Sequence, residues 1–128
     1  MGRILRWTIA LAYFALLTFL LLTPRLPYGA YAFLHLFRHA DKVAHFFALG
    51  FLGVMIARAL SDPAKASVRG LTLLVTIVVT AFYAVAVEFI QPHFHRTFEV
   101  LDMVDGVLGV LVFLFAWVGL RKRIRILA

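Results

Sequence analysis

Residues 70–90 read GLTLLVTIVVTAFYAVAVEFI, an apolar run that contains one charged side chain, Glu88, and is followed by Gln91 and Pro92. A helix needs about 20 mostly apolar residues to cross the hydrocarbon core of a bilayer, and this run is long enough. Lipid cannot form hydrogen bonds with exposed backbone groups, so a segment that crosses it must be helical. The run therefore predicts a transmembrane helix that stops before the proline.

Three more apolar runs of similar length lie on either side of this one, at about residues 4–22, 43–60 and 101–120. Each is followed by a proline or by a basic block, which are signals for the end of a helix. Hydrophobic residues make up 64% of the chain and charged residues 15%, compared with roughly 45–50% and about 25% in soluble domains. This composition excludes an ordinary soluble enzyme, a disordered chain and a collagen-like fibre. We predict one all-α, polytopic membrane domain over residues 1–128, with four transmembrane helices.

The segment between the first two runs, residues 31–40, reads YAFLHLFRHA. It is too short to cross a bilayer, but it is rich in aromatic residues and carries histidine and arginine. Such a composition is typical of a segment that lies at the membrane interface or enters the bilayer partway. The alternative is a plain loop with aromatic anchors.

Basic residues are distributed unequally between the two sides of the predicted membrane. With four spans, both termini and the loop at about residues 61–69 share one side. That side carries nine basic residues, namely Arg3, Arg6, Arg58, Lys65, Arg69, Arg121, Lys122, Arg123 and Arg125. The opposite side carries four, namely Arg25, Arg38, Lys42 and Arg96. The positive-inside rule then places both termini in the cytoplasm. Since this orientation accounts for most of the net charge of +7, we do not expect nucleic acid as a partner.

The remaining ionisable residues gather on the other, outer side. Asp62 alone among the six acids lies on the cytoplasmic side. The outer side holds Asp41, Glu88, Glu99, Asp102, Asp105 and all five histidines, His35, His39, His45, His93 and His95. Ionisable groups at membrane depth are costly and usually functional. We therefore expect a polar site at the outer end of the bundle.

Asp41 and His45 are four residues apart at the start of the second span, so they share a helix face. Asp41 can orient the His45 ring there, or it can simply cap the helix, because an acid is favourable at a helix N-terminus. His45 lies a turn further in, where capping explains nothing. We therefore expect His45 to have a functional role.

Glu88 stands at the C-terminal end of the third span, where an acid opposes the helix macrodipole. Neither capping nor solvation explains it, so it requires a partner such as Lys42, Arg96 or a bound cation. In the fourth span, Asp102 falls near one helical stripe with Gly106 and Gly109. These glycines should let a neighbouring helix approach closely and bring the carboxylate against the second and third spans.

Several kinds of chemistry fit these residues. His45, Glu88 and Asp102 offer imidazole and carboxylate ligands for a divalent cation, although the chain has no His-Glu-x-x-His motif and no cysteine. Lys42 and Arg96 can bind an anionic head group, with His45, Glu88 or Asp102 in acid–base roles. The predicted ligand-binding residues are Asp41, Lys42, His45, Glu88, Gln91, Arg96 and Asp102.

These residues form an ordered pattern. Asp41-Lys42-x-x-His45 opens one span, Glu88-x-x-Gln91 closes the next, and Arg96-x-x-Glu99-x-x-Asp102 precedes Gly109 in the last. The pattern covers about residues 41–110 and resembles that of the VanZ-like family of small bacterial membrane proteins. One difference is Gly106, because the family usually has an asparagine four residues after the aspartate.

The resemblance implies a cell-envelope role at the outer face of the bacterial cytoplasmic membrane. The namesake of the family is associated with resistance to the glycopeptide teicoplanin, but the resemblance supplies no reaction. The leading hypothesis is a site that binds an envelope lipid, such as a polyprenyl-phosphate-linked precursor, or a glycopeptide-type ligand. The alternatives are a membrane enzyme that acts on a lipid-linked phosphate, and a structural polar network without a ligand. Since small bundles often dimerise, a homodimer is also a partner hypothesis.

Overall fold

The computed structural model of the chain describes residues 2–22, 40–62, 64–65, 68–94 and 100–123. These residues form four long helices, α1 (Arg3–Leu22), α3 (Ala40–Leu60), α4 (Gly70–Ile90) and α5 (Val100–Arg121). A short 3-10 turn, η1 (Gln91–Phe94), follows α4. Each of the four regions is long and apolar enough to cross a membrane. The prediction of an all-α polytopic membrane protein is thus confirmed.

The predicted spans agree closely with these helices. The largest difference is at α3, which begins at Ala40 instead of residue 43. Asp41 and Lys42 therefore belong to the first turn of α3 and do not precede it. Residues 31–39 of the predicted interfacial segment lie outside the described residues, and residue 40 belongs to α3.

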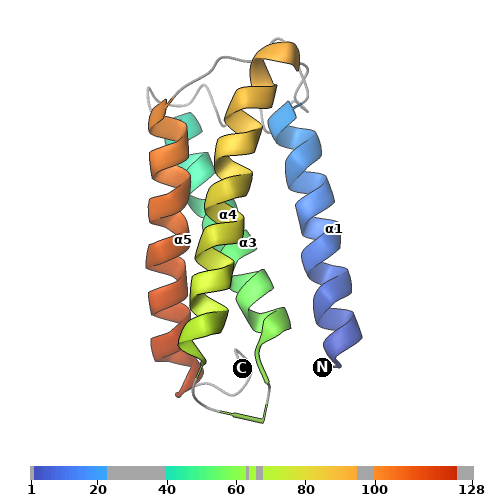
Figure 1. The fold of residues 1–128 in the computed structure, drawn as a ribbon, viewed down its shortest axis with the longest axis vertical. Helices are drawn as coiled ribbons and strands as arrows, with labels where there is room; N and C mark the ends of the chain where they lie inside the picture. The colour runs from blue at the N-terminus through green and yellow to red at the C-terminus, as the bar shows by residue number, and fades with distance from the viewer. Residues whose placement is uncertain (1, 23–39, 63, 66–67, 95–99, 124–128) are drawn as a thin grey trace.

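The helices run side by side along the long axis of the molecule (Figure 1). At one end of the bundle α1 and α4 begin, and α3 and α5 finish. We call this the Arg121 end. At the other end α3 and α5 begin and α4 finishes, and we call it the Lys42 end. Because α1 starts and α5 finishes at the same end, the described helices cross the bundle an even number of times.

Apolar side chains occupy both the interior and the surface of the bundle. The interior is formed by residues such as Leu49, Leu52, Val110 and Leu114. Outward-facing aromatic side chains are also numerous, with Phe82 76% exposed and Phe115 70% exposed. A soluble protein rarely exposes so much contiguous apolar surface. These outer faces are suited to contact with lipid.

Helices α3 and α5 approach each other most closely along a line of glycines. Gly50 and Gly53 lie on α3, and Gly106 and Gly109 lie on α5. A Cβ atom at Gly109 would overlap the backbone carbonyl of Phe46, so only glycine fits there. Small residues commonly allow this approach between membrane helices. The contact places the first turn of α5, which contains Asp102, next to the first turns of α3.

Candidate functional site

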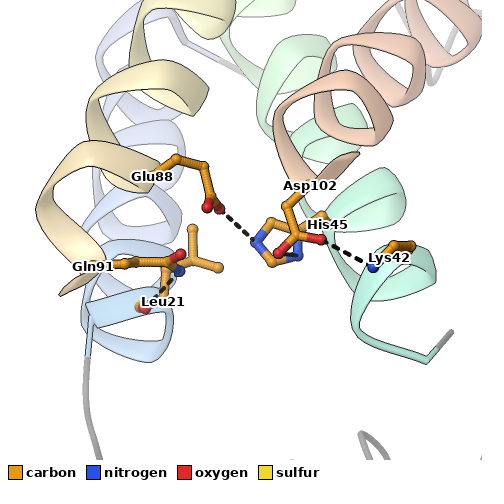
Figure 2. Close-up of polar contacts among 6 residues, drawn as sticks. All are labelled: Leu21, Lys42, His45, Glu88, Gln91 and Asp102. Carbon is orange, nitrogen blue, oxygen red and sulfur yellow. Dashed lines mark hydrogen bonds and ion pairs between the residues drawn. The ribbon is translucent and has the colours of Figure 1, made fainter. Parts of the chain in front are cut away.

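Three ionisable side chains from three helices meet near the Lys42 end. His45 comes from α3, Glu88 from α4 and Asp102 from α5 (Figure 2). Their exposed fractions are 7%, 1% and 6%, respectively. Charged groups are seldom buried this deeply unless they are paired. The convergence of three such groups on one buried point makes this the candidate site.

The His45 ring lies between the two carboxylates. Its Nε2 atom is 3.7 Å from Oε1 of Glu88, and its Nδ1 atom is 3.8 Å from Oδ2 of Asp102. Hydrogen bonds between nitrogen and oxygen span about 2.7–3.2 Å, so these are electrostatic contacts at slightly longer range. A shift of less than about 1 Å would turn either contact into a charge-assisted hydrogen bond.

Lys42 extends this cluster toward the surface. Its Nζ atom is 3.8 Å from Oδ1 of Asp102, and its side chain is 21% exposed. Asp102 thus contacts the imidazole through one oxygen and the ammonium through the other (Figure 2). The order Glu88, His45, Asp102, Lys42 leads from the buried interior to a partly exposed cation. We call these four residues the Lys42 cluster.

The elements that hold these side chains explain part of their placement. Asp102 lies in the first turn of α5, where the macrodipole favours an acid. Glu88 lies near the C-terminal end of α4, where the same dipole disfavours an acid. Within the described residues, the His45 ring faces the Glu88 carboxylate. This pairing can therefore stabilise Glu88, whereas the helix end cannot.

Gln91 connects the cluster region to α1. Its side-chain Nε2 donates a hydrogen bond of 3.0 Å to the backbone carbonyl of Leu21 (Figure 2). Carbonyls in the last turn of a helix lack a partner within that helix, so this amide satisfies one of them. Gln91 is 2% exposed and fixes the end of α1 against the turn that follows Glu88.

A hollow of about 330 Å³ lies beside the cluster on the surface of α3 and α5. It is lined by Lys42, Val43, Phe46, Phe47 and Asp105. Lys42 belongs to both the hollow and the cluster. The hollow therefore combines an apolar wall with a cation that a buried carboxylate helps to position.

The structure brings together four of the predicted site residues, Lys42, His45, Glu88 and Asp102. The side chain of Asp41 is not described, so its predicted pairing with His45 stays a prediction. Among the described side chains, the Nδ1 atom of His45 faces Asp102. His93 is exposed in η1, whereas Arg96 and the other predicted polar residues His35, His39, His95 and Glu99 lie outside the described residues.

The hollow itself was not expected from the sequence. A signal for it was present, because Lys42 and Phe46 are four residues apart and share a helix face. The participation of Asp105 depends on the approach of α5 to α3, which no local pattern specifies.

The donor atoms of His45, Glu88 and Asp102 lie within 4.8 Å of one another. A divalent cation binds nitrogen and oxygen ligands at about 2.0–2.6 Å, so the three side chains would have to contract around it. The space that they enclose with neighbouring residues leaves no room for a water molecule. The described arrangement is a packed ionisable cluster that can hold a cation, and its partly exposed member is Lys42.

Gly106 occupies the position where the resembled family usually has an asparagine. A Cβ atom there would overlap Cδ1 of Leu49. In this chain the Leu49 side chain fills the space that a larger residue on α5 would need. An amide could enter this part of the bundle only if Leu49 moved.

Comparison with protein families gives a match between residues 5–121 and the VanZ/LLP1 family. Comparisons with curated proteins and with solved structures give no match. The matched region includes nearly all of the four helices and the whole Lys42 cluster. By this match over most of its length, the chain belongs to the VanZ/LLP1 family.

Proposed function

We propose that this protein binds an anionic membrane lipid at the Lys42 end of the bundle. The head group would contact Lys42, and part of the apolar chain would lie in the hollow beside Phe46 and Phe47. The observation that carries the proposal is the dual position of Lys42, which contacts buried Asp102 and also lines the apolar hollow.

The first support is the charge arrangement. An ammonium group can donate hydrogen bonds in three directions, so a Lys42 side chain that contacts Asp102 can also contact an anionic oxygen. The contact with Asp102 restricts where the ammonium lies, and His45 and Glu88 stand behind that carboxylate. Asp105 lines the same hollow. Its carboxylate would repel the anionic part of a ligand and so favour a pose in which that part lies at Lys42.

The second support is the apolar wall of the hollow. The rings of Phe46 and Phe47 lie 6.0 Å and 5.6 Å from the Phe113 ring, both at steep angles. Edge-to-face contacts of this kind fix aromatic rings in place. Lipid chains already surround the protein, so moving one into the hollow gains no hydrophobic free energy. The favourable contribution would be van der Waals contact with a rigid aromatic surface.

The third support is the charge distribution along the sequence. If the positive-inside rule holds for this chain, the Lys42 end faces outward and both termini are cytoplasmic. The ligand would then be a lipid of the outer leaflet of a bacterial cytoplasmic membrane, such as a polyprenyl-phosphate-linked envelope precursor. This would be a cell-envelope role, of which resistance to a glycopeptide such as teicoplanin would be one consequence.

The test is native mass spectrometry of the full chain after gentle release from membranes. We expect wild type to retain a phosphate-bearing lipid, and Lys42→Gln to retain it about fivefold less, since one basic charge contributes about 1 kcal/mol to such binding. Lys122→Gln removes an exposed lysine at the opposite end and should match wild type. Equal retention by wild type and Lys42→Gln would overturn the proposal. So would retention of added teicoplanin in place of lipid.

The donor set of His45, Glu88 and Asp102 supports a second candidate, a divalent cation that serves an enzyme acting on a lipid-linked phosphate. Metal analysis of the purified protein should then find about one divalent ion per chain. His45→Ala should lower the metal affinity at least about tenfold, as loss of a ligand or its support does, and should abolish phosphate release from a polyprenyl phosphate. The matched control is His93→Ala, which removes an exposed histidine. Metal content and turnover that survive His45→Ala would exclude this candidate.

A further inference from the structure

The Arg121 end holds a second concave site, far from the Lys42 cluster along the bundle. A pocket of about 440 Å³ opens there between the start of α1, the chain that follows α3 and the start of α4. Among the described residues, those that line it include the basic side chains of Arg3, Lys65 and Arg69, together with one acid, Asp62. The pocket is therefore a place where positive charge converges.

The N-terminus of α4 adds to this positive potential. The helix begins at Gly70, and its N-cap residue, Arg69, makes no side-chain capping hydrogen bond. The first backbone N–H groups of a helix have no partner within the helix, and its macrodipole favours an anion there. Thr72, in the same first turn, lines the pocket. The backbone donors and the basic side chains thus both favour an anionic ligand.

Buried arginine side chains hold the chain that forms the pocket. Arg121 is 3% exposed and donates from Nη2 to the backbone carbonyls of Asp62 and Lys65. Arg6 is 6% exposed and donates to the carbonyl of Arg58 over 3.1 Å. Charge-assisted hydrogen bonds therefore hold the backbone carbonyls of Asp62 and Lys65 through Arg121, and the last turn of α3 through Arg6.

Asp62, the one acid among the described residues that line the pocket, is engaged within its own segment. Oδ1 of Asp62 accepts a hydrogen bond of 2.9 Å from the backbone N–H of Ala64. This contact holds the carboxylate in a local turn. The pocket lining as a whole keeps more positive than negative charge.

We infer that this pocket is a binding site for a phosphate group, held by Lys65, Arg69 and Arg3 at the N-terminus of α4. Basic pockets between membrane helices commonly bind the head groups of anionic lipids. A free phosphate ion offers the same chemistry. The site is independent of the proposed function at Lys42, because it shares none of its residues.

The test is a titration of the full chain by native mass spectrometry with two probes, short-chain phosphatidylglycerol and inorganic phosphate. Two variants are compared with wild type. Lys65→Gln/Arg69→Gln removes two exposed basic residues of the pocket, whereas Lys122→Gln/Arg123→Gln removes two exposed basic residues that do not line it. Melting temperatures without ligand establish that both variants fold.

We expect the pocket variant to bind the lipid about 30-fold more weakly than wild type, which is the effect of two head-group contacts. The control variant should change the affinity less than about twofold. If inorganic phosphate binds with the same dependence on Lys65 and Arg69, the source of the group is a free anion. If only the lipid does, the source is a head group. Equal weakening in both variants, or in neither, would overturn the proposal. The Lys42 site is unaltered in both variants, so its success or failure does not affect this comparison.

Discussion

Gly109→Ala should strongly destabilise the folded protein and lower its melting temperature. A Cβ atom at this position would overlap the carbonyl oxygen and carbon of Phe46. These atoms belong to the backbone of α3, so no change of side-chain rotamer relieves the overlap. Helices α3 and α5 would have to separate where they pack most closely. We expect a cost of about 3 kcal/mol, at the upper end of the usual range for overpacking.

The measurement is thermal unfolding of the purified protein in detergent, followed by circular dichroism and by the fraction that remains monodisperse. Gly119→Ala is the matched control, because it adds the same methyl group to the same helix where nothing lies within 4 Å. This control should have about the same melting temperature as wild type. If the two variants melt alike, the close approach of α5 to α3 does not exist in the folded protein.

Asp102→Asn should also lower the stability of the folded protein strongly. The substitution keeps the shape of the side chain but removes the charge that faces both His45 and Lys42. Removing one member of a buried ion pair costs about 3–5 kcal/mol. The lower end of that range is expected here, about 3 kcal/mol, because Lys42 is partly exposed and water can solvate it. The melting temperature should fall accordingly.

Asp105→Asn provides the control for this effect, since it removes a half-buried carboxylate one turn later on the same helix. It should change the stability by less than about 0.5 kcal/mol. A double-mutant cycle with Lys42→Met then isolates the pair, because the double variant should lose less stability than the two single losses added together. Additive losses would mean that Lys42 and Asp102 do not interact.

Asp102→Asn and Lys42→Gln together distinguish the hypothesis of a lipid-binding site from that of a purely structural network. A network without a ligand predicts that Asp102→Asn lowers stability and that no specific lipid is retained even by wild type. A lipid site predicts that wild type retains the lipid and that Lys42→Gln retains about fivefold less of it. The two hypotheses therefore differ in the wild-type spectrum as well as in the variants.

The transmembrane helices were predictable because the property that creates them is local. Residues 70–90 are apolar and uninterrupted, and α4 has the same bounds. Its apolar composition, and the requirement that its backbone groups form hydrogen bonds within the segment, make it a transmembrane helix whatever the rest of the chain does. The need of Glu88 for a partner was also predictable, since an acid in this place conflicts with both the lipid and the helix dipole, and the His45 ring faces it.

Which groups face one another was decided by the tertiary structure. The sequence offered Lys42, Arg96 or a cation as partners for Glu88, and the described residues place His45 there. It offered Asp41 as the carboxylate that orients His45, which stays a prediction, and the described residues add Asp102 from α5, which also faces the ring. Such pairings depend on the distance and rotation between helices, and those are set by contacts such as Gly109 against Phe46.

The sequence by itself thus determined the spans, the helix ends and the identity of the residues that cannot lie in lipid without a partner. Only the packing of the helices decided that four of them form one cluster, that Lys42 also lines an apolar hollow, and that Arg3, Lys65 and Arg69 line one pocket at the Arg121 end. The physical reason is that apolar periodicity and helix termination act over a few residues. A site built from several helices exists only once close packing has fixed their backbones against one another.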